Sequence, residues 1–134
     1  MYQKMKKINK TPEEWRQRLT EAEYHVTRKK GTEAPFSGKL YNNDEKGIYN
    51  CKCCGNHLFS SSSKFESGTG WPSFFEVLSD DSVNIKKDFS HSMIRFEVLC
   101  ANCDAHLGHV FDDGPRPTGK RYCINSISLD FIKD

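Results

Sequence analysis

Two short helices are predicted near the N-terminus, at about residues 12–18 and 21–28. Each begins after a Thr that is followed three residues later by a Glu: Thr11 with Glu14, and Thr20 with Glu23. At a helix start, each side chain of such a pair can accept a hydrogen bond from the backbone amide of the other residue. Pro12 suits the first helical position, where its missing N–H would have no partner. We expect the second helix to end before Gly31.

Beyond Gly31 the pattern changes to short segments bounded by turns, which is typical of strands. In residues 93–99, apolar Ile94, Phe96 and Val98 alternate with Arg95, Glu97 and Leu99. The C-terminus repeats this period of two over residues 126–131, where Ile127, Leu129 and Phe131 alternate with Ser126, Ser128 and Asp130. Such alternation predicts half-buried strands. Further strands are expected near residues 47–50, 83–85 and 121–125, and a turn at 112–117, so the body should be mainly antiparallel β.

The length of 134 residues corresponds to one domain, which we place at residues 11–134 behind a flexible basic N-terminus, residues 1–10. The net charge is only +2, which argues against a dedicated nucleic-acid binder. The excess of positive charge in the first thirty residues is better explained by a solvated helical face. No apolar run approaches the roughly 18 residues that would indicate a membrane span. We see no secretory signal, so a cytoplasmic, reducing environment is expected for the six cysteines.

Four cysteines form two Cys-x-x-Cys pairs, Cys51 with Cys54 and Cys100 with Cys103. Two intervening residues allow one tight turn to present both sulfurs to a single ion, and two such turns complete the tetrahedron that Zn²⁺ prefers. Gly55 follows the first pair, where the backbone must turn sharply. The sequence therefore predicts one structural zinc ion that joins two distant loops.

Three other uses of the cysteines remain open at this point. One pair could be a thioredoxin-like redox site, although the expected βαβ context is missing. Alternatively, a local metal site could form from residues spaced three apart: Cys100, Cys103, His106 and His109. A secreted disulfide-bonded domain that has lost its leader is the third possibility.

Cys123 is the only cysteine outside the Cys-x-x-Cys regions, and it is a candidate nucleophile. If residues 121–125 form a strand, Arg121, Cys123 and Asn125 share one face, while the intervening side chains point into the core. A guanidinium favours a thiolate, and an amide can orient a substrate. The alternative is an inert, buried cysteine.

Two histidines strengthen the functional interpretation of Cys123. His106 and His109 could supply a general acid and its orienting partner, although a regular strand would direct them to opposite faces. Gly108 between them can mark a β-bulge that brings the two rings together. A structural role for either histidine is the competing interpretation.

Trp71 lies between glycines in the segment Gly68-Thr69-Gly70-Trp71-Pro72-Ser73-Phe74. A rigid loop with an exposed indole can line an apolar subsite for a methyl or thioether group. A tryptophan that simply covers the core is the alternative.

Taken together, these segments resemble the B-type methionine sulfoxide reductases, which act on the R epimer of methionine sulfoxide. The resemblance runs from about residue 11 to 132, and it is carried by the Cys-x-x-Cys pairs and by three further stretches: Ser67–Phe74, Cys100–Phe111 and Arg121–Ser126. It implies two antiparallel sheets in a tent-like arrangement, with zinc far from the catalytic face. It also implies Cys123 as the nucleophile, surrounded by His106, His109, Arg121 and Asn125, with Trp71 against the substrate methyl.

The resemblance also implies substrates and a reducing partner, and at one position the chain differs from the usual pattern of the family. Proteins that contain methionine-R-sulfoxide are the implied substrates, thioredoxin is the implied reductant, and we expect a monomer without nucleic-acid or membrane partners. Many members carry a resolving cysteine where this chain has Thr69. Direct reduction of Cys123 by an external thiol is therefore the favoured recycling route, with Cys53 as the alternative resolving residue.

Two non-enzymatic interpretations compete with this assignment. A zinc-containing binding or chaperone module on the same scaffold explains the four ligands but gives no use for Cys123. A zinc-ribbon nucleic-acid binder needs clustered basic residues, whereas residues 31–134 carry a net charge of −3. Only the enzyme predicts a single reactive thiol of low pKa.

Overall fold

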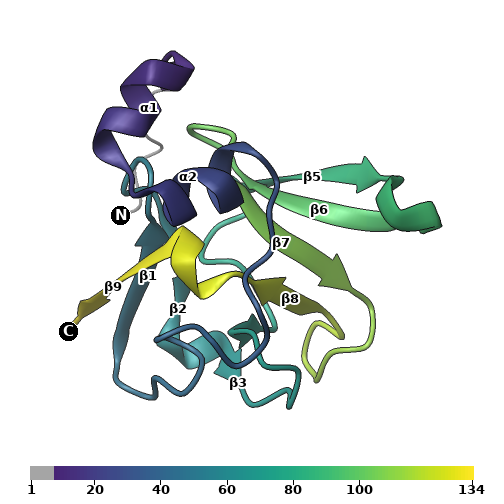
Figure 1. Ribbon diagram of the computed structural model, residues 1–134. Coiled ribbons are helices and arrows are strands. Elements are labelled where there is room, and N and C mark those ends of the chain that lie inside the picture. Colours follow the sequence, from purple (N-terminus) through teal and green to yellow (C-terminus); the bar gives the residue numbers. More distant parts are fainter. Residues whose placement is uncertain (1–7) are drawn as a thin grey trace.

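The computed structural model describes residues 8–134, in which two short helices precede a body of β-strands (Figure 1). Helices α1 (Pro12–Arg18) and α2 (Glu21–Arg28) occupy the predicted ranges. At both helix starts the Thr hydroxyl accepts a hydrogen bond from the Glu amide, and the Glu carboxylate accepts one from the Thr amide. The two predicted helices and their capping residues are therefore confirmed.

Two antiparallel sheets form the body, as predicted. The smaller has the strand order β2-β1-β9 and consists of β1 (Gly47–Cys51), β2 (His57–Ser60) and β9 (Leu129–Lys133). The larger has the order β3-β4-β8-β7-β6-β5 and consists of β3 (Lys64–Phe65), β4 (Ser73–Phe74), β5 (Val83–Asp88), β6 (Arg95–Cys100), β7 (His106–Phe111) and β8 (Arg121–Ile124). Short 3₁₀ turns lie at η1 (Ser61–Ser63), η2 (Ser90–Ser92) and η3 (Ser126–Ser128). In Figure 1 the β5–β6 hairpin projects on the side away from the smaller sheet.

The hydrophobic core joins the two sheets through aromatic side chains. Phe59 on β2 stacks on Phe74 on β4 with ring centroids 4.3 Å apart, and Tyr49 on β1 meets Phe74 edge-on at 5.0 Å. These three side chains and Ile124 on β8 are completely buried. Burial of alternate side chains of β8 in this core leaves the intervening side chains on the other face of the larger sheet.

Two predicted strands differ from the structure in their details. In the segment predicted as a strand at residues 93–99, Ile94, just before β6, and Phe96 on β6 are 68% and 41% exposed, whereas Glu97 is 1% exposed, so the predicted inward face is wrong for most of the segment. The β5–β6 hairpin extends past the core, so these two apolar side chains are exposed. The Glu97 carboxylate is instead held in the interior by its hydrogen bond with the buried His106. At the C-terminus, β9 begins only at Leu129 because residues 126–128 form η3.

Part of the predicted flexible N-terminus, residues 1–7, lies outside the described residues. Within the described part, the amide of Ile8 donates a hydrogen bond to the carbonyl of Asn102 at 2.7 Å, and the Ile8 side chain packs against the core. Trp15 on α1 is 3% exposed and is a core tryptophan. No helix in residues 8–134 combines the length and apolar character needed to cross a bilayer.

Candidate active site and metal centre

A cavity of about 300 Å³ opens on the face of the larger sheet that is turned away from the aromatic core. It is lined by side chains from β6, β7 and β8 and from the loops that flank the sheet: Thr32, Thr69, Trp71, Arg95, His109, Phe111, Arg121, Cys123 and Asn125. The structure thus brings together five of the six side chains predicted for the catalytic and substrate-binding site. The sixth, His106, does not line this cavity.

Strand β8 places Cys123 at the centre of the site. Arg121 and Cys123 face the cavity together with Asn125, which directly follows the strand, whereas Ile124 points into the core as predicted. In the sheet register, Cys123 lies opposite His109 on β7 and opposite Ser73 on β4. All six cysteines lie within the described residues, and only Cys123 lines this cavity.

The pKa of Cys123 lies above its ordinary value, contrary to the low pKa expected from its neighbours. Burial raises the pKa of Cys123 above its ordinary value, and the charge of Arg121 and a hydrogen bond from Thr69 only partly offset this effect. A strand pattern shows which charge lies beside a thiol but does not show how deeply the thiol is buried. The expectation that these neighbours give Cys123 a low pKa is therefore corrected.

His109 is the histidine that faces the cavity, and Asp88 on β5 holds it. Nε2 of His109 lies 2.8 Å from Oδ2 of Asp88. The pKa of Asp88 is far below its ordinary value, chiefly because of this hydrogen bond, so its ionised carboxylate accepts a hydrogen bond from the Nε2–H group. Burial lowers the pKa of His109, which makes the imidazole neutral near pH 7. Its Nδ1 is then an unprotonated base.

His106 lies deeper in the sheet, beside a second buried carboxylate. Its Nδ1 is 2.7 Å from Oε2 of Glu97, and both side chains are almost fully buried. Lys30 on the chain after α2 lies 3.2 Å from the other oxygen of Glu97. The rings of His106 and His109 meet edge-on with centroids 5.5 Å apart. His106 is therefore in position to support His109 but not to reach a ligand in the cavity.

A β-bulge accounts for this arrangement of the two histidines, as predicted. Val98 pairs with Gly108, and the next residue of β6, Leu99, pairs with His106, so Leu107 is the extra residue of β7. Gly108 lies against β8, where a Cβ atom would be 2.0 Å from the carbonyl oxygen of Cys123. The glycine is thus required for the close approach of the two strands that carry the site.

Trp71 is half-buried and lines the cavity, so it is not the core tryptophan that the alternative proposed. Its Nε1 donates a hydrogen bond to the carbonyl oxygen of Glu33 at 3.0 Å, which fixes the plane of the indole. Asn125 is also fixed, because its Nδ2 donates to the carbonyl of Leu107 at 3.1 Å and its Oδ1 accepts from the amide of Glu33 at 3.0 Å.

Arg121 is held in place by a carboxylate and an aromatic ring. Its Nε and Nη2 donate to the two oxygens of Asp113 at 2.9 and 3.2 Å, and its guanidinium lies 4.5 Å from the centre of the Phe111 ring. This bidentate geometry directs the cation toward the thiol side of the cavity. The turn at 112–117 supplies the carboxylate, a role that its turn composition did not reveal.

Arg95 is a cavity residue that sequence reasoning missed. It pairs with Asp88 across the β5–β6 hairpin, with its Nη2 3.5 Å from Oδ2 of the carboxylate. Its Nε is buried and has no hydrogen-bond partner among the described residues. Only the strand register reveals the pairing of Arg95 with Asp88, since the two residues lie on separate strands.

The structure places Thr69 against the candidate nucleophile. The Thr69 side chain hydrogen-bonds Cys123 and lowers its pKa. Its hydroxyl also lies 2.8 Å from that of Ser67. Cys53, the alternative resolving residue, is completely buried in the core and does not line the cavity.

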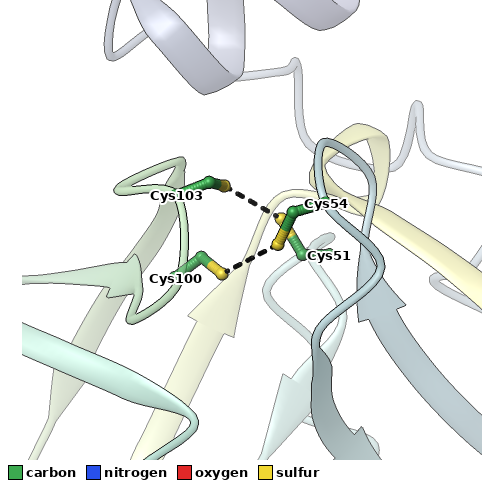
Figure 2. Close-up of side chains that lie close together, drawn as sticks. All are labelled: Cys51, Cys54, Cys100 and Cys103. Atoms are coloured by element: carbon green, nitrogen blue, oxygen red, sulfur yellow. Dashed lines mark hydrogen bonds between the residues drawn. The ribbon is translucent and has the colours of Figure 1, made fainter. Parts of the chain in front are cut away.

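The four cysteines of the Cys-x-x-Cys pairs converge at one point, as predicted (Figure 2). Their sulfur atoms all lie within 4.8 Å of one another. Cys51 is 3.7 Å from Cys103, and Cys54 is 3.5 Å from Cys100. A tetrahedral Zn²⁺ with bonds of about 2.3 Å needs sulfurs roughly 3.8 Å apart, and disulfide bonds are much shorter. The donor set and its spacing therefore fit a tetrahedral thiolate-bound metal ion.

Each pair of cysteines is held by the same backbone turn. The amide of Gly55 donates to the carbonyl of Cys51 and the amide of Asp104 to that of Cys100, both at 2.8–2.9 Å. Gly55 has a positive φ of +81°, which confirms the sharp turn predicted after the first pair, and Asp104 has the same kind of turn after the second pair, with a φ of +63°.

Among the described residues, Cys100 and Cys103 group with Cys51 and Cys54 and with neither His106 nor His109, which does not fit the alternative local site. The sulfurs also have donors nearby: Asn56 Nδ2 lies 3.7 Å from Cys100 Sγ, and Arg28 Nη2 lies 4.0 Å from Cys103 Sγ. Such contacts offset the negative charge of thiolate ligands.

Comparison with known proteins agrees with the geometry. A family model described as the SelR domain matches residues 19–133. Proteins named peptide methionine sulfoxide reductase MsrB are 63% identical to this chain in Methanosarcina barkeri and 62% in Methanosarcina mazei, covering 94% and 96% of the chain and 89% and 91% of those proteins. A protein of the same name from Hahella chejuensis is 56% identical over 95% of the chain and 91% of its own length. The chain belongs to the SelR family, the family of the B-type methionine sulfoxide reductases.

Proposed function

We propose that this protein reduces the R epimer of peptide-bound methionine sulfoxide to methionine, with Cys123 as the nucleophile. One observation carries the proposal: the Cys123 thiol shares a cavity with a fixed indole, a carboxylate-held imidazole and two guanidinium groups. The apolar ring of Trp71 suits the methyl group of the substrate. The cations and the imidazole suit its sulfoxide oxygen.

The chemistry balances without any further cofactor. The Cys123 sulfur attacks the sulfoxide sulfur, the S–O bond breaks, and the oxygen passes to Cys123 as a sulfenic acid, Cys–SOH, while methionine leaves. The proton of the thiol ends on the transferred oxygen, so methionine sulfoxide is reduced by two electrons and the cysteine is oxidised by two. Two external thiols then return the sulfenic acid to a thiol and form one disulfide and one water.

His109 is the residue that moves the proton in this proposal. Its Nε2 donates to Asp88, so Nδ1 is free to take the proton of the Cys123 thiol. The imidazolium that forms is stabilised by the Asp88 carboxylate and can protonate the sulfoxide oxygen. The buried His106–Glu97 pair positions His109 from behind.

The selection of a single epimer follows from three fixed contact points. Trp71 fixes the methyl group, Cys123 approaches the sulfur, and the oxygen lies toward His109 and the guanidinium group of Arg95. In the opposite epimer, the oxygen and the lone pair of the pyramidal sulfur exchange places. If the methyl group stays on Trp71, the oxygen then points away from the acid, His109. Only one configuration can therefore satisfy all three contacts.

For recycling, we propose that thioredoxin or a small thiol attacks oxidised Cys123 directly. Thr69 cannot form a disulfide, and Cys53 would have to leave the core and disturb its two metal-binding neighbours. We also propose that the enzyme acts in the cytoplasm, and we expect it to act as a monomer.

The metal in the four-cysteine site is proposed to be one structural zinc ion. Cys51, Cys54, Cys100 and Cys103 would hold it, and four thiolates leave no open position for a substrate. The ion would fix the loop after β1 to the loop after β6, and it takes no part in the reaction.

The test measures reduction of separated R and S epimers of a methionine sulfoxide peptide, with dithiothreitol as the reductant. Turnover of the R epimer alone, loss of turnover in Cys123→Ser, and a sulfenic acid trapped on Cys123 by dimedone are expected. The metal content and melting temperature of Cys123→Ser should match those of the parent. Substantial turnover by Cys123→Ser would overturn the assignment of the nucleophile.

A further inference from the structure

The segment that follows α2, residues 31–38, contacts two separate parts of the cavity wall through one residue, Glu33. The backbone amide of Glu33 donates to Oδ1 of Asn125, and its backbone carbonyl accepts from Nε1 of Trp71, both at 3.0 Å. One residue thus fixes the amide that follows the nucleophile strand and the indole of the substrate subsite.

The carboxylate of Glu33 anchors this residue to the chain beyond β8. Its Oε2 accepts from the amide of Ser126 and its Oε1 from the amide of Ile127, both at 2.9 Å. These are the first amides of η3, and Asn125, the residue before that turn, makes no side-chain cap. A bidentate carboxylate from a distant segment therefore takes the place of the usual local cap.

The packing around the carboxylate leaves little freedom. A Cβ atom on Gly38 would lie 2.2 Å from Cβ of Ser126 and 2.7 Å from Oε2 of Glu33, so the segment and η3 are in close contact. A further contact ties the segment to the loop that carries Trp71, because the amide of Phe36 donates to the carbonyl of Gly70 at 2.7 Å. The segment is thus fixed on both sides of the cavity.

The geometry points to Glu33 as a positioning residue, which sets the relative placement of Trp71 and Asn125 by holding its own peptide groups between them. Glu33 does not line the cavity and touches no reacting atom in this assignment. This inference rests on the proposed function, because the two side chains it joins are those assigned to the substrate methyl and to the neighbourhood of Cys123.

Glu33→Gln tests the inference with little change in shape. A glutamine amide offers one oxygen and one NH₂ group, so it can accept from only one of the two η3 amides and sets its NH₂ against the other. We expect kcat/KM for the R sulfoxide to fall about 10- to 100-fold, since small displacements of positioning groups have effects of this size. We expect KM to rise and kcat to fall, because the substitution displaces both Trp71 in the methyl subsite and Asn125 beside the nucleophile.

Two readouts separate positioning from a general structural role. The fluorescence emission of Trp71 should shift in Glu33→Gln, and Trp15, the other tryptophan, is buried elsewhere and should not contribute to the change. The same substitution is also made in a Trp71→Phe background, which lacks the indole N–H. There Glu33→Gln should lower kcat/KM by a markedly smaller factor than in the parent, because the contact from Glu33 to the indole is already absent.

Glu14→Gln is the matched control, because its carboxylate also accepts from a backbone amide but belongs to α1, outside the cavity. It should leave both activity and the emission unchanged. Melting temperature and metal content establish that each variant is folded. If Glu33→Gln does not fold, Glu33→Asp, which keeps the charge and shortens the reach, is measured in the same way.

The outcomes are distinct. An inactive parent protein would refute the proposed function itself. An active parent with a folded Glu33 variant that retains kcat/KM within about twofold and an unchanged Trp71 emission would overturn the positioning role. An equal loss in the parent and in the Trp71→Phe background would show that Glu33 does not act through Trp71, which also overturns the inference.

Discussion

Gly108→Ala is the substitution whose consequence follows most directly from the geometry of the site. Gly108 lies at the bulge of β7, between the two histidines and opposite Ile124 on β8. A Cβ atom there would be 2.0 Å from the carbonyl oxygen of Cys123 and 3.0 Å from Cα of Ile124. Both contacts are with backbone atoms, so no side chain can rotate away to relieve them.

The required movement sets the size of the effect. Ordinary van der Waals contact begins at 3.4 Å, so β8 must move away from β7 by about 1.4 Å at the Cys123 carbonyl. Overpacking of a core typically costs about 1–3 kcal/mol, and a clash with the backbone of β8, which cannot rotate away, belongs at the upper end. For a chain of this size, about 3 kcal/mol corresponds to a decrease of roughly 10 °C in melting temperature.

The assay combines thermal melting, metal analysis and sulfoxide turnover. We expect the melting temperature to fall by this amount, the metal content to stay the same, and kcat/KM to fall about 100-fold, because the displaced carbonyl belongs to the proposed nucleophile. Gly119→Ala is the control: its φ is +73° and a Cβ atom there meets nothing within 4 Å, so only local backbone strain of about 1 kcal/mol is expected. A Gly108→Ala protein with the melting temperature and turnover of the parent would refute the reasoning.

Four further predictions concern the cysteines and His109. Cys103→Ser is expected to lose metal and cooperative unfolding together, because the binding energy of a structural zinc, on the order of 10 kcal/mol, is largely folding energy; metal-free protein that melts like the metal-bound form would contradict this. Alkylation of Cys123 by iodoacetamide should be slow at pH 7 and rise above about pH 8.5, since burial raises its pKa, and rapid alkylation at pH 6 would contradict it. Because burial lowers the pKa of His109, the unfolded chain takes up its proton first as the pH falls below about 6.5; urea titrations should therefore show that His109→Gln loses less stability than the parent between pH 7 and pH 5.5, and equal losses would contradict this. Cys53→Ser should retain thioredoxin-dependent turnover with a trappable sulfenic acid on Cys123, whereas a Cys53–Cys123 disulfide in the parent with lost turnover in the variant would refute direct reduction.

Features encoded by neighbouring residues were predictable from the sequence. The two helices start and end where their Thr–Glu pairs and flanking residues indicate, because capping is a contact between residues three apart. The convergence of four cysteines was predictable for a similar reason, since each Cys-x-x-Cys turn is local and a metal requires both turns. The alternation of Arg121, Cys123 and Asn125 likewise follows from strand geometry alone.

Features that depend on partners from distant segments were not predictable. The buried position of Glu97 follows from its contacts with His106 and Lys30, which no pattern within residues 93–99 contains. The C-terminal segment does not continue as a strand through Ser126 because its amides bond to the Glu33 carboxylate, more than ninety positions earlier in the chain. In both cases a local alternation of apolar and polar residues was overridden by a long-range charged contact.

The raised pKa of Cys123 is consistent with the proposed reaction when the whole charge balance is considered. Thiol and sulfoxide are both neutral, and their products, a sulfenic acid and a thioether, are neutral as well, so the net change is the movement of one proton from sulfur to oxygen. A buried cavity opposes a resting thiolate but does not oppose this overall conversion. Charge separates only during the transfer, when the sulfur lies beside Arg121 and the imidazolium of His109 lies beside Asp88, so each transient charge has a fixed counter-charge. The same burial keeps Cys123 protonated, and therefore slow to react with other electrophiles, until a substrate oxygen is present to receive the proton.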